Sequence, residues 1–313
     1  MPPESGLRSA LRSWWLGGHS QWSYDHPLFR KTRASPPKVR ILGDHSDYHC
    51  GSWAAIESIR QNCLRSGYRL AGRYEPFDIL VVNGEGSMHG SNIARRNVFV
   101  KKMEVLKRAI EAGIPAYLVN TVWQNNVSSY DHVLRMLSGI QVREIDSYND
   151  LLTAHGVPSL VKIDASFFLA VKQAPSLTPN ARIVITDFFM TAGGQFEAHA
   201  LDLGDTEYVS MKDIGWPDFV TKLANSKLLV TGRHHAVFAA CKARTPFIVL
   251  KGNNHKVTGL LETAGVRLPV AKTLDEIPAL VAEIGQHQAA YDQLFNWMHA
   301  RPDTPILPDL NRA

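Results

Sequence analysis

The feature of this sequence that most constrains its fold is a regular alternation of short apolar segments with longer amphipathic ones. In the first half, segments typical of strands occupy 38–43, 77–86, 114–124, 139–147 and 160–169. Helical patterns lie between them at 53–67, 98–113, 132–139 and 147–156, and each of these ends at a glycine. Strands that alternate with helices predict a parallel, doubly wound sheet.

The second half repeats this alternation after a polar, proline-containing stretch at 171–181. Strand patterns follow at 182–190, 227–232, 246–252 and 268–270, with helical patterns at 216–226, 235–244, 253–265, 273–285 and 287–300. We therefore predict an α/β fold of two doubly wound, Rossmann-like domains that face a cleft, the GT-B-like architecture. The predicted divisions are an arm at 1–37, domains at 38–175 and 180–285, and a C-terminal helix and tail at 286–313.

Composition limits the classes of protein that this chain can belong to. Its 313 residues suit about two domains, and 45% hydrophobic with 20% charged residues excludes general disorder. The 34 lysines and arginines against 29 acids give a net charge of +5, which suits an anionic substrate or surface. The basic residues are dispersed and no RNA-binding signature occurs, so we do not expect nucleic acid as a partner.

The cysteines and the apolar runs indicate where the protein works. The three cysteines form no CxxC motif, which favours free thiols in a reducing compartment. No apolar run is long enough to cross a bilayer, and the N-terminus lacks the apolar core of a signal peptide. We expect a cytoplasmic protein.

The arm at 1–37 is basic and carries Trp14, Trp15 and Trp22. One interpretation places it on an anionic membrane surface, at the inner face of the membrane, where enzymes acting on lipid-linked glycans work. The other packs the arm on its own domain, with the tryptophans as anchors. The short apolar stretch favours the second interpretation.

Two turns of the first half carry candidate functional residues directly after strands. The first reads GDHSDYHCGS and opens a helix, so its backbone N–H groups favour an anion, and Ser46 and His49 add side-chain donors. A metal site here would need converging ligands from elsewhere, so we predict no metal. The second turn reads NGEGSMHG, in which glycines flank Glu85 and His89 follows. A carboxylate held there is a natural general base for a sugar hydroxyl.

Two further segments of the first half carry charge. Arg143 lies in VREIDS, and Asp164 ends an apolar strand pattern in KIDASFF. At such a position Asp164 either faces the ligand or caps the turn.

The second half places cations after two strands. The segments TGRHHA and KGNNHK each link a strand to a helix and carry Arg233, His235, Asn253 and Lys256. Cationic donors at helix N-termini suit a phosphate or a carboxylate, so these residues predict an anion site.

In their order along residues 39–265, these motifs resemble the polysaccharide pyruvyl transferase family. The resemblance rests on Gly43-Asp44, on the glycine-rich turn, on Arg143-Glu144 with Ser147, on Asp164 with Phe167, on Arg233 with His235, and on Pro246 with Lys256. It implies a transferase of surface-polysaccharide synthesis that moves a pyruvyl group from phosphoenolpyruvate onto a sugar as a ketal. The implied acceptor is a saccharide or a lipid-linked glycan. No cofactor is implied, because phosphoenolpyruvate itself supplies the transferred group.

The resemblance also implies residue roles and leaves a second donor open. The domain at 38–175 takes the acceptor and that at 180–285 the donor. Catalysis is assigned to Glu85, His89 and Asp164, and anion binding to Ser46, His49, Arg143, Arg233, His235, Asn253 and Lys256. The family's turn is usually uncharged, whereas Glu85 interrupts it here. That departure is similar to retaining transferases of 3-deoxy-manno-octulosonic acid, which use a cytidine-monophosphate sugar and for which Asp164 would be the nucleophile.

A third interpretation comes from a different class of protein. A glycan- or nucleotide-binding relative would keep this fold without turnover. It predicts that Glu85, Asp164 and the Arg233–His235 pair do not gather around one ligand.

Overall fold

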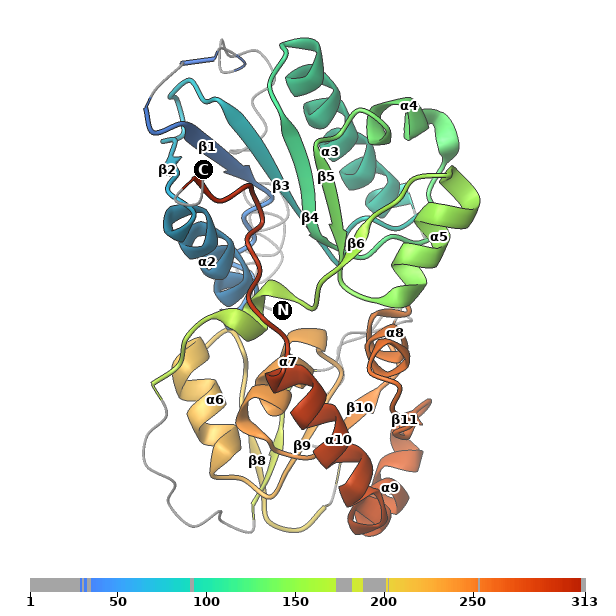
Figure 1. Cartoon of the computed structure of the whole chain (residues 1–313). Coiled ribbons are helices and arrows are strands. Elements are labelled where there is room, and N and C mark those ends of the chain that lie inside the picture. Colours follow the sequence, from blue (N-terminus) through green and yellow to red (C-terminus); the bar gives the residue numbers. More distant parts are fainter. Residues whose placement is uncertain are drawn as a thin grey trace, which may run out of the picture. The chain divides into compact units, whose positions relative to one another are not determined.

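The computed structural model describes residues 29, 31–32, 35–90, 93–172, 182–187, 201, 203–252 and 254–310. These residues form two parallel sheets with flanking helices, as the alternating pattern predicts (Figure 1). The chain divides into two compact units. The first contains the described residues up to Tyr48, together with Ile56–Lys162 and the segment from Thr304. The second contains His49–Ala55 and Ile163–Asp303.

The first unit holds a six-stranded sheet in which all neighbouring strands are parallel. Its order is β2 (Arg69–Leu70), β1 (Lys38–Leu42), β3 (Ile79–Glu85), β4 (Ala116–Thr121), β5 (Gly139–Val142) and β6 (Leu160–Val161). The helices between these strands are α2 (Cys50–Arg65), α3 (Ile93–Glu111), α4 (Asp131–Leu134) and α5 (Ile145–His155). Its core is apolar, and Phe77, Phe99 and Trp123 are its largest members.

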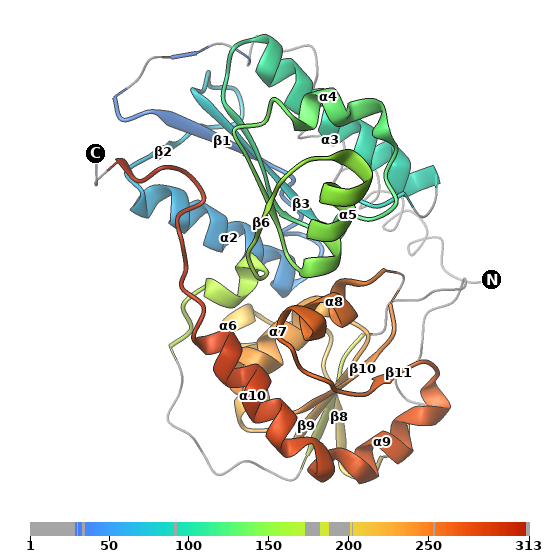
Figure 2. The same ribbon diagram turned by 45° about the vertical axis from the view of Figure 1, so that its right-hand side comes forward.

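The second unit holds a five-stranded parallel sheet. Its order is β11 (Val270–Ala271), β10 (Phe247–Leu250), β9 (Leu228–Thr231), β7 (Ile183–Ile185) and β8 (Thr206–Tyr208). The helices of this unit are α6 (Trp216–Ala224), α7 (His234–Ala243), α8 (Lys256–Thr263), α9 (Ile277–Glu283) and α10 (Gln288–His299). Figure 2 shows α9 and α10 running beside the strands of this sheet.

Both sheets have the same strand order, although they share no evident sequence repeat. Counted along the chain within each unit, the order is second, first, third, fourth and fifth strand, with a sixth added in the first unit. In such a sheet the connections leave in opposite directions at the switch point between the first and third strands, and ligands bind beyond the carboxyl ends there. The switch points lie between β1 and β3 and between β7 and β9.

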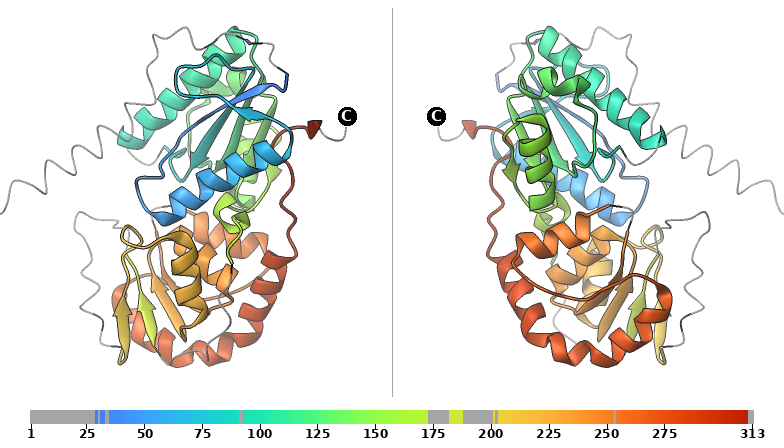
Figure 3. Two further views of the ribbon diagram at one scale, coloured as in Figure 1. Left: turned by 90° about the vertical axis from the view of Figure 1, so that its left-hand side faces the viewer. Right: turned by 90° about the vertical axis from the view of Figure 1, so that its right-hand side faces the viewer.

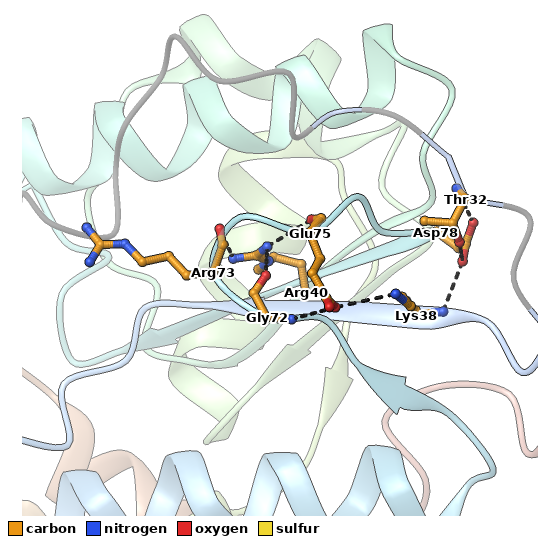
Figure 4. Close-up of polar contacts among 7 residues, drawn as sticks. All are labelled: Thr32, Lys38, Arg40, Gly72, Arg73, Glu75 and Asp78. Atoms are coloured by element: carbon orange, nitrogen blue, oxygen red, sulfur yellow. Dashed lines mark hydrogen bonds and ion pairs between the residues drawn. The ribbon is translucent and has the colours of Figure 1, made fainter.

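A buried arginine fixes the outer edge of the first sheet (Figure 4). The Arg40 guanidinium donates to the carbonyl oxygens of Gly72, of Arg73 at 2.7 Å and of Glu75 at 3.0 Å. Beside it, Asp78 accepts from the backbone N–H groups of Thr32 at 2.8 Å and Lys38 at 2.9 Å. These bonds satisfy the polar groups where the chain enters β1 and where it leaves the edge strand β2.

The last described residues belong to the first unit, although α10 belongs to the second. The backbone N–H of Ile306 donates to Oδ1 of Asn62 at 2.7 Å, and the Asn62 amide donates to the carbonyl of Thr304. Leu310 N–H donates to the carbonyl of Ser66 at the end of α2. Figure 3 shows this segment in red beyond α10.

Three local features differ from the sequence expectation. The edge strand β8 was not expected, because its charged sequence TEY lacks an apolar pattern. The strand expected at 160–169 ends at Val161. There the Asp164 side chain accepts from the backbone N–H of Ser166 and starts a 3-10 turn over Ala165–Phe168. The helix expected at 132–139 is the short α4.

Two expectations fall largely on residues outside the described part of the chain. These are the arm at 1–37, of which residues 29, 31–32 and 35–37 are described, and the domain boundary at 171–181, of which only 171 and 172 are described. All three cysteines lie in the described ranges and are buried and free. Within those ranges, no helix is both long enough and apolar enough to span a membrane.

Candidate functional site

At the switch point of the first unit, the turns after β1 and β3 are joined by hydrogen bonds. The Asn83 amide donates to the carbonyl of Gly43 at 3.0 Å and accepts from the Asn120 amide at 3.1 Å. Gly43 has a positive φ of 79°, and a Cβ there would lie 2.2 Å from the Asn83 carbonyl oxygen. A glycine is therefore required for this close approach.

A buried lysine holds the glycine-rich turn. Lys102, on α3, has no exposed surface, and its ammonium donates to the carbonyl oxygens of Asn83 and Gly84, both at 2.8 Å. Its third contact is the Ser87 hydroxyl at 2.7 Å. Three acceptors match the three protons of an ammonium group, which is what makes its burial tolerable.

Glu85, in this turn, has a backbone conformation that is rare for a residue with a side chain. Its φ is +46°, and its side chain is buried. A Cβ on the preceding Gly84 would overlap Thr121, and one on Gly86 would lie 3.4 Å from an Nη atom of Arg143. Glu85 and Arg143 thus belong to one end of the first sheet, and a conformation of this kind is often kept at functional sites.

The turn after β1 carries His45 and Ser46. The Ser46 backbone N–H donates to Oδ1 of Asp44 at 2.9 Å, and Oδ2 of Asp44 pairs with Arg60 at 2.7 Å. Burial lowers the pKa of His45 from its usual value, and Glu85 opposes this while Lys102 adds to it. His45 therefore lies within electrostatic range of the glycine-rich turn.

His89 and the VREIDS segment complete the first unit's predicted residues. His89 is buried and forms an isolated parallel bridge with Gln124. Arg143 is buried, but its neighbour Glu144 serves the fold, because its side chain caps α5 by accepting from the backbone N–H of Ser147 at 2.9 Å. The Ser147 hydroxyl accepts from the backbone of Trp123 at 2.7 Å.

At the switch point of the second unit, α7 begins directly after β9. Arg233 is its N-cap residue, and its backbone N–H donates to the Thr231 hydroxyl at 2.9 Å. That hydroxyl is 2.5 Å from the hydroxyl of Thr186, which follows β7. The two threonines thus connect the first and third strands of this sheet, beside the positive end of α7.

The beginning of α2 lies against α7 through a glycine. A Cβ on Gly51 would lie 2.3 Å from Cβ of His235, so only glycine fits. Nδ1 of His49 accepts the backbone N–H groups of Gly51 at 3.1 Å and Ser52 at 3.2 Å, and thereby caps α2. The rings of His49 and His235 are 5.1 Å apart, edge to face.

Asp164 faces His234 and His235 and also caps a turn. It is fully buried, and its Oδ2 lies 3.5 Å from Nε2 of His235 and 4.0 Å from Nε2 of His234. Its Oδ1 accepts from the backbone N–H of Ser166 at 2.9 Å. Of the two interpretations of Asp164, the capping role is observed, and the ligand-facing role stays a prediction.

The pKa of His49 is lowered by its surroundings, which include several basic side chains. Burial lowers it well below the usual 6.5, and the nearby His235, Arg233 and Lys256 lower it further. Lys256 is the first residue of α8. His235, Arg233 and Lys256 thus lie within electrostatic range of His49, whereas Asn253 is outside the described residues.

The predicted residues of the described part form no metal-binding group, and they do not line the hollow found in the second unit. Across the described part of the chain, no group of three or more His, Cys, Asp or Glu side chains is placed to hold a metal ion. A shallow hollow of about 350 Å³ contains none of the predicted residues, and its lining is Glu207, Asp218, Thr221, Lys222, Asn225 and Ser226.

Sequence reasoning missed Lys102 and the role of His45. The signal for Lys102 was present, because it falls on the same helical face as Phe99, Met103 and Leu106, which are buried. A lysine on such a face must find buried acceptors.

This chain is similar to known proteins in its fold but not detectably in its sequence. No family model matches the chain, and no curated protein matches it in sequence. A candidate UDP-N-acetylglucosamine 2-epimerase from Listeria monocytogenes is a structural neighbour with 10% identity and a TM-score of 0.54, covering 82% of this chain and 90% of its own. An uncharacterized protein from Klebsiella pneumoniae has 13% identity and a TM-score of 0.50, covering 84% and 94%. These likenesses agree with a GT-B-like fold of two Rossmann-like domains.

Proposed function

We propose that this protein is a transferase that moves a pyruvyl group from phosphoenolpyruvate to a sugar of a surface-glycan precursor. The observation that carries the proposal is the grouping of basic side chains at the N-terminus of α7, where Arg233 is the N-cap residue and His235 lies in the first turn. There His235, Arg233 and Lys256 together lower the pKa of the capping residue His49. Like charges gathered at one place repel, and an anion bound there relieves that repulsion.

Phosphoenolpyruvate suits such a site because it is small and carries both a phosphate and a carboxylate. Arginine binds either group in a bidentate manner, and a helix N-terminus adds backbone donors. We assign donor binding to Arg233, His235, His49 and Lys256, with Ser46, Arg143 and Asn253 as further anion-binding candidates.

The reaction itself needs proton transfers. Two sugar hydroxyls each form a bond to C2 of phosphoenolpyruvate, its C–O bond to phosphate breaks, and C3 gains a proton to become a methyl group. One hydroxyl proton balances that gain, and the other leaves with phosphate. The candidates for moving these protons are the three residues predicted to be catalytic, Glu85, His89 and Asp164.

The buried carboxylate of Asp164 favours one alternative, a retaining glycosyltransferase with a cytidine-monophosphate sugar donor. There Asp164 would attack the sugar and form a covalent intermediate. A binding protein without turnover is the third possibility. The proposed setting is the cytoplasm, since three free buried thiols fit a reducing compartment. Contact of residues 1–37 with the inner membrane face is the less favoured alternative for the arm.

Binding of the purified protein to phosphoenolpyruvate and, in parallel, to cytidine monophosphate tests the donor. A ligand that binds only the native state raises the Tm, so a thermal shift followed by calorimetry identifies it. We expect phosphoenolpyruvate to bind and Arg233→Ala to lower its affinity about a hundredfold, the loss of a charge-assisted bidentate contact. Arg267→Ala, at an exposed position, is the matched control. Binding of the nucleotide alone would replace pyruvyl transfer by the glycosyltransferase alternative.

Glu85→Gln tests the acceptor side. If Glu85 moves a proton of the acceptor, the variant keeps its affinity for phosphoenolpyruvate and its Tm but loses turnover by about a hundredfold, a typical contribution of acid–base catalysis. A lower Tm with unchanged turnover would instead make Glu85 a structural residue.

A further inference from the structure

Two side chains at the second switch point have no role in the proposed function. Asp187 follows β7, and Tyr208 is the last residue of the neighbouring strand β8. β7 is the first strand of its sheet and β9, which precedes Arg233, is the third. Asp187 and Arg233 therefore occupy the two sides of the switch point, where a ligand of this fold binds.

Along the sequence these residues are far apart, but in the structure they form a chain of polar contacts. The Tyr208 hydroxyl donates to Oδ1 of Asp187. The other oxygen, Oδ2, lies 3.9 Å from Nε of Arg233, and both side chains are largely buried, at 15% and 13% exposure. The backbone is tied as well, since Gly232 N–H donates to the Asp187 carbonyl at 3.3 Å.

We propose that Asp187 and Tyr208 are positioning residues that orient the Arg233 guanidinium toward an oxyanion at this switch point. Asp187 faces the Nε side of the guanidinium, and the opposite edge carries the two Nη groups that bind a carboxylate or phosphate in a bidentate manner. Arginine has a long side chain with many rotamers, so a contact at Nε reduces the entropy lost when the anion binds. The inference rests on the proposed anion site and names how Arg233 is held there.

Tyr208 keeps this arrangement over a wide pH range. Burial, together with its hydrogen bond to Asp187, raises the pKa of Tyr208 to about 12. The hydroxyl therefore stays protonated and remains a donor to the carboxylate. A donor that fixes one oxygen of Asp187 leaves the direction of the other oxygen, toward Arg233, defined.

A simpler role for Asp187 predicts the opposite sign, which makes the inference testable. If Asp187 only neutralises Arg233, removing its charge strengthens the attraction of Arg233 for an anion. If Asp187 positions Arg233, removing its charge weakens anion binding, although the net charge becomes more positive.

The experiment measures binding of inorganic phosphate, phosphoenolpyruvate and cytidine monophosphate by calorimetry to the full-length protein and its variants. We expect Asp187→Asn and Tyr208→Phe each to weaken binding of the anion by about tenfold. The first variant loses the ion pair with Arg233, and the second loses the hydrogen bond that orients Asp187. Asp205→Asn is the matched control, because Asp205 pairs with Arg182 at 3.2 Å, next to the other end of β7 and β8, and is 61% exposed. Its affinity should equal that of the wild type.

A double variant separates positioning from general damage. In an Arg233→Lys background the charge is kept but the Nε–H is absent, so adding Asp187→Asn should cause no further loss. A tenfold loss in that background as well, or a gain of affinity in Asp187→Asn alone, overturns the inference. If Asp187→Asn does not fold, the affinity of Tyr208→Phe is compared in the same way, in the wild-type background and in the Arg233→Lys background.

The same data distinguish this inference from the proposed function. Cytidine monophosphate binding in place of phosphoenolpyruvate overturns pyruvyl transfer, while a tenfold loss of that nucleotide in the two variants still supports positioning. Phosphoenolpyruvate binding that neither variant changes supports the proposed function and overturns positioning. Failure of all three anions to bind overturns both.

Discussion

The two sheets have the same strand order, but the basic side chains at their switch points have different surroundings. In the first unit the buried ammonium of Lys102 is surrounded by three protein acceptors. In the second unit His235, Arg233 and Lys256 lie close enough to lower the pKa of His49, with the Asp164 carboxylate beside the histidines. The Lys102 ammonium donates to three protein acceptors and holds a turn, whereas the basic side chains of the second unit are grouped around His49. The comparison teaches that a buried cation whose donors are all met by protein acceptors serves the fold, whereas basic side chains grouped at a helix N-terminus are candidates for binding an anion.

The largest expected effect tests the structural side of this comparison. Lys102→Met removes the ammonium and leaves three buried acceptors without it, so we expect the free energy of unfolding to fall by about 3 to 5 kcal/mol. Urea denaturation measures it. Lys107→Met, at a half-exposed position of the same helix that pairs with Glu111 at 3.9 Å, should change stability by no more than about 0.5 kcal/mol. Equal effects in the two variants would mean that Lys102 does not hold the turn.

The next effect tests whether the second switch point needs its close packing. In Gly51→Ala the new methyl group would meet Cβ of His235 at 2.3 Å, so His235 and α7 must shift. We expect a loss of about 2 kcal/mol in stability, as in other overpacked positions, together with weaker phosphoenolpyruvate binding. Gly285→Ala is the control, because nothing lies within 4 Å of the place that its new methyl group would take. Unchanged affinity for phosphoenolpyruvate in a stable Gly51→Ala variant would mean that the packing of α2 against α7 does not affect anion binding.

The smallest effect concerns pH. A histidine whose pKa is lower in the folded state than its usual 6.5 binds fewer protons there than in the unfolded chain. Its neutral form therefore supports folding above about pH 6.5, and that support is lost as the pH falls below this value. His49→Asn keeps an acceptor that can cap α2 but removes the titration. We expect the stability of this variant to fall by about 0.7 kcal/mol less than that of the wild type between pH 7 and 6. A parallel loss in both proteins would contradict the lowered pKa.

The alternating pattern was sufficient to predict the two doubly wound sheets, because each buried strand is apolar and each helix ends at a recognisable residue. The strand β8 could not be found in this way. It lies at the edge of its sheet, where Glu207 pairs with Arg182 and Lys222, and a half-exposed strand of this kind need not be apolar. Tyr208, and with it the contact to Asp187, was therefore hidden from sequence reasoning.

The placement of residues after strands predicted which side chains lie at each switch point, but not what each one does. Arg143 and Glu144 are neighbours in one motif, yet Glu144 caps α5 while Arg143 lies beside Gly86. His49 was expected to donate to an anion, and the pattern did not predict that its Nδ1 accepts two backbone N–H groups and caps α2. Such differences depend on side-chain directions, which a pattern of residue types does not contain.

The way in which the chain is divided between its two units has a consequence for how the protein is made. The first unit includes Thr304 and the residues after it, whose hydrogen bonds to Asn62 and Ser66 join the last described segment to α2. During synthesis the strands of the first unit therefore emerge from the ribosome before those of the second, but they lack these contacts until the segment from Thr304 to Leu310 has been translated. A fragment ending at Asp303 would contain every strand of both sheets and would still leave the first unit incomplete.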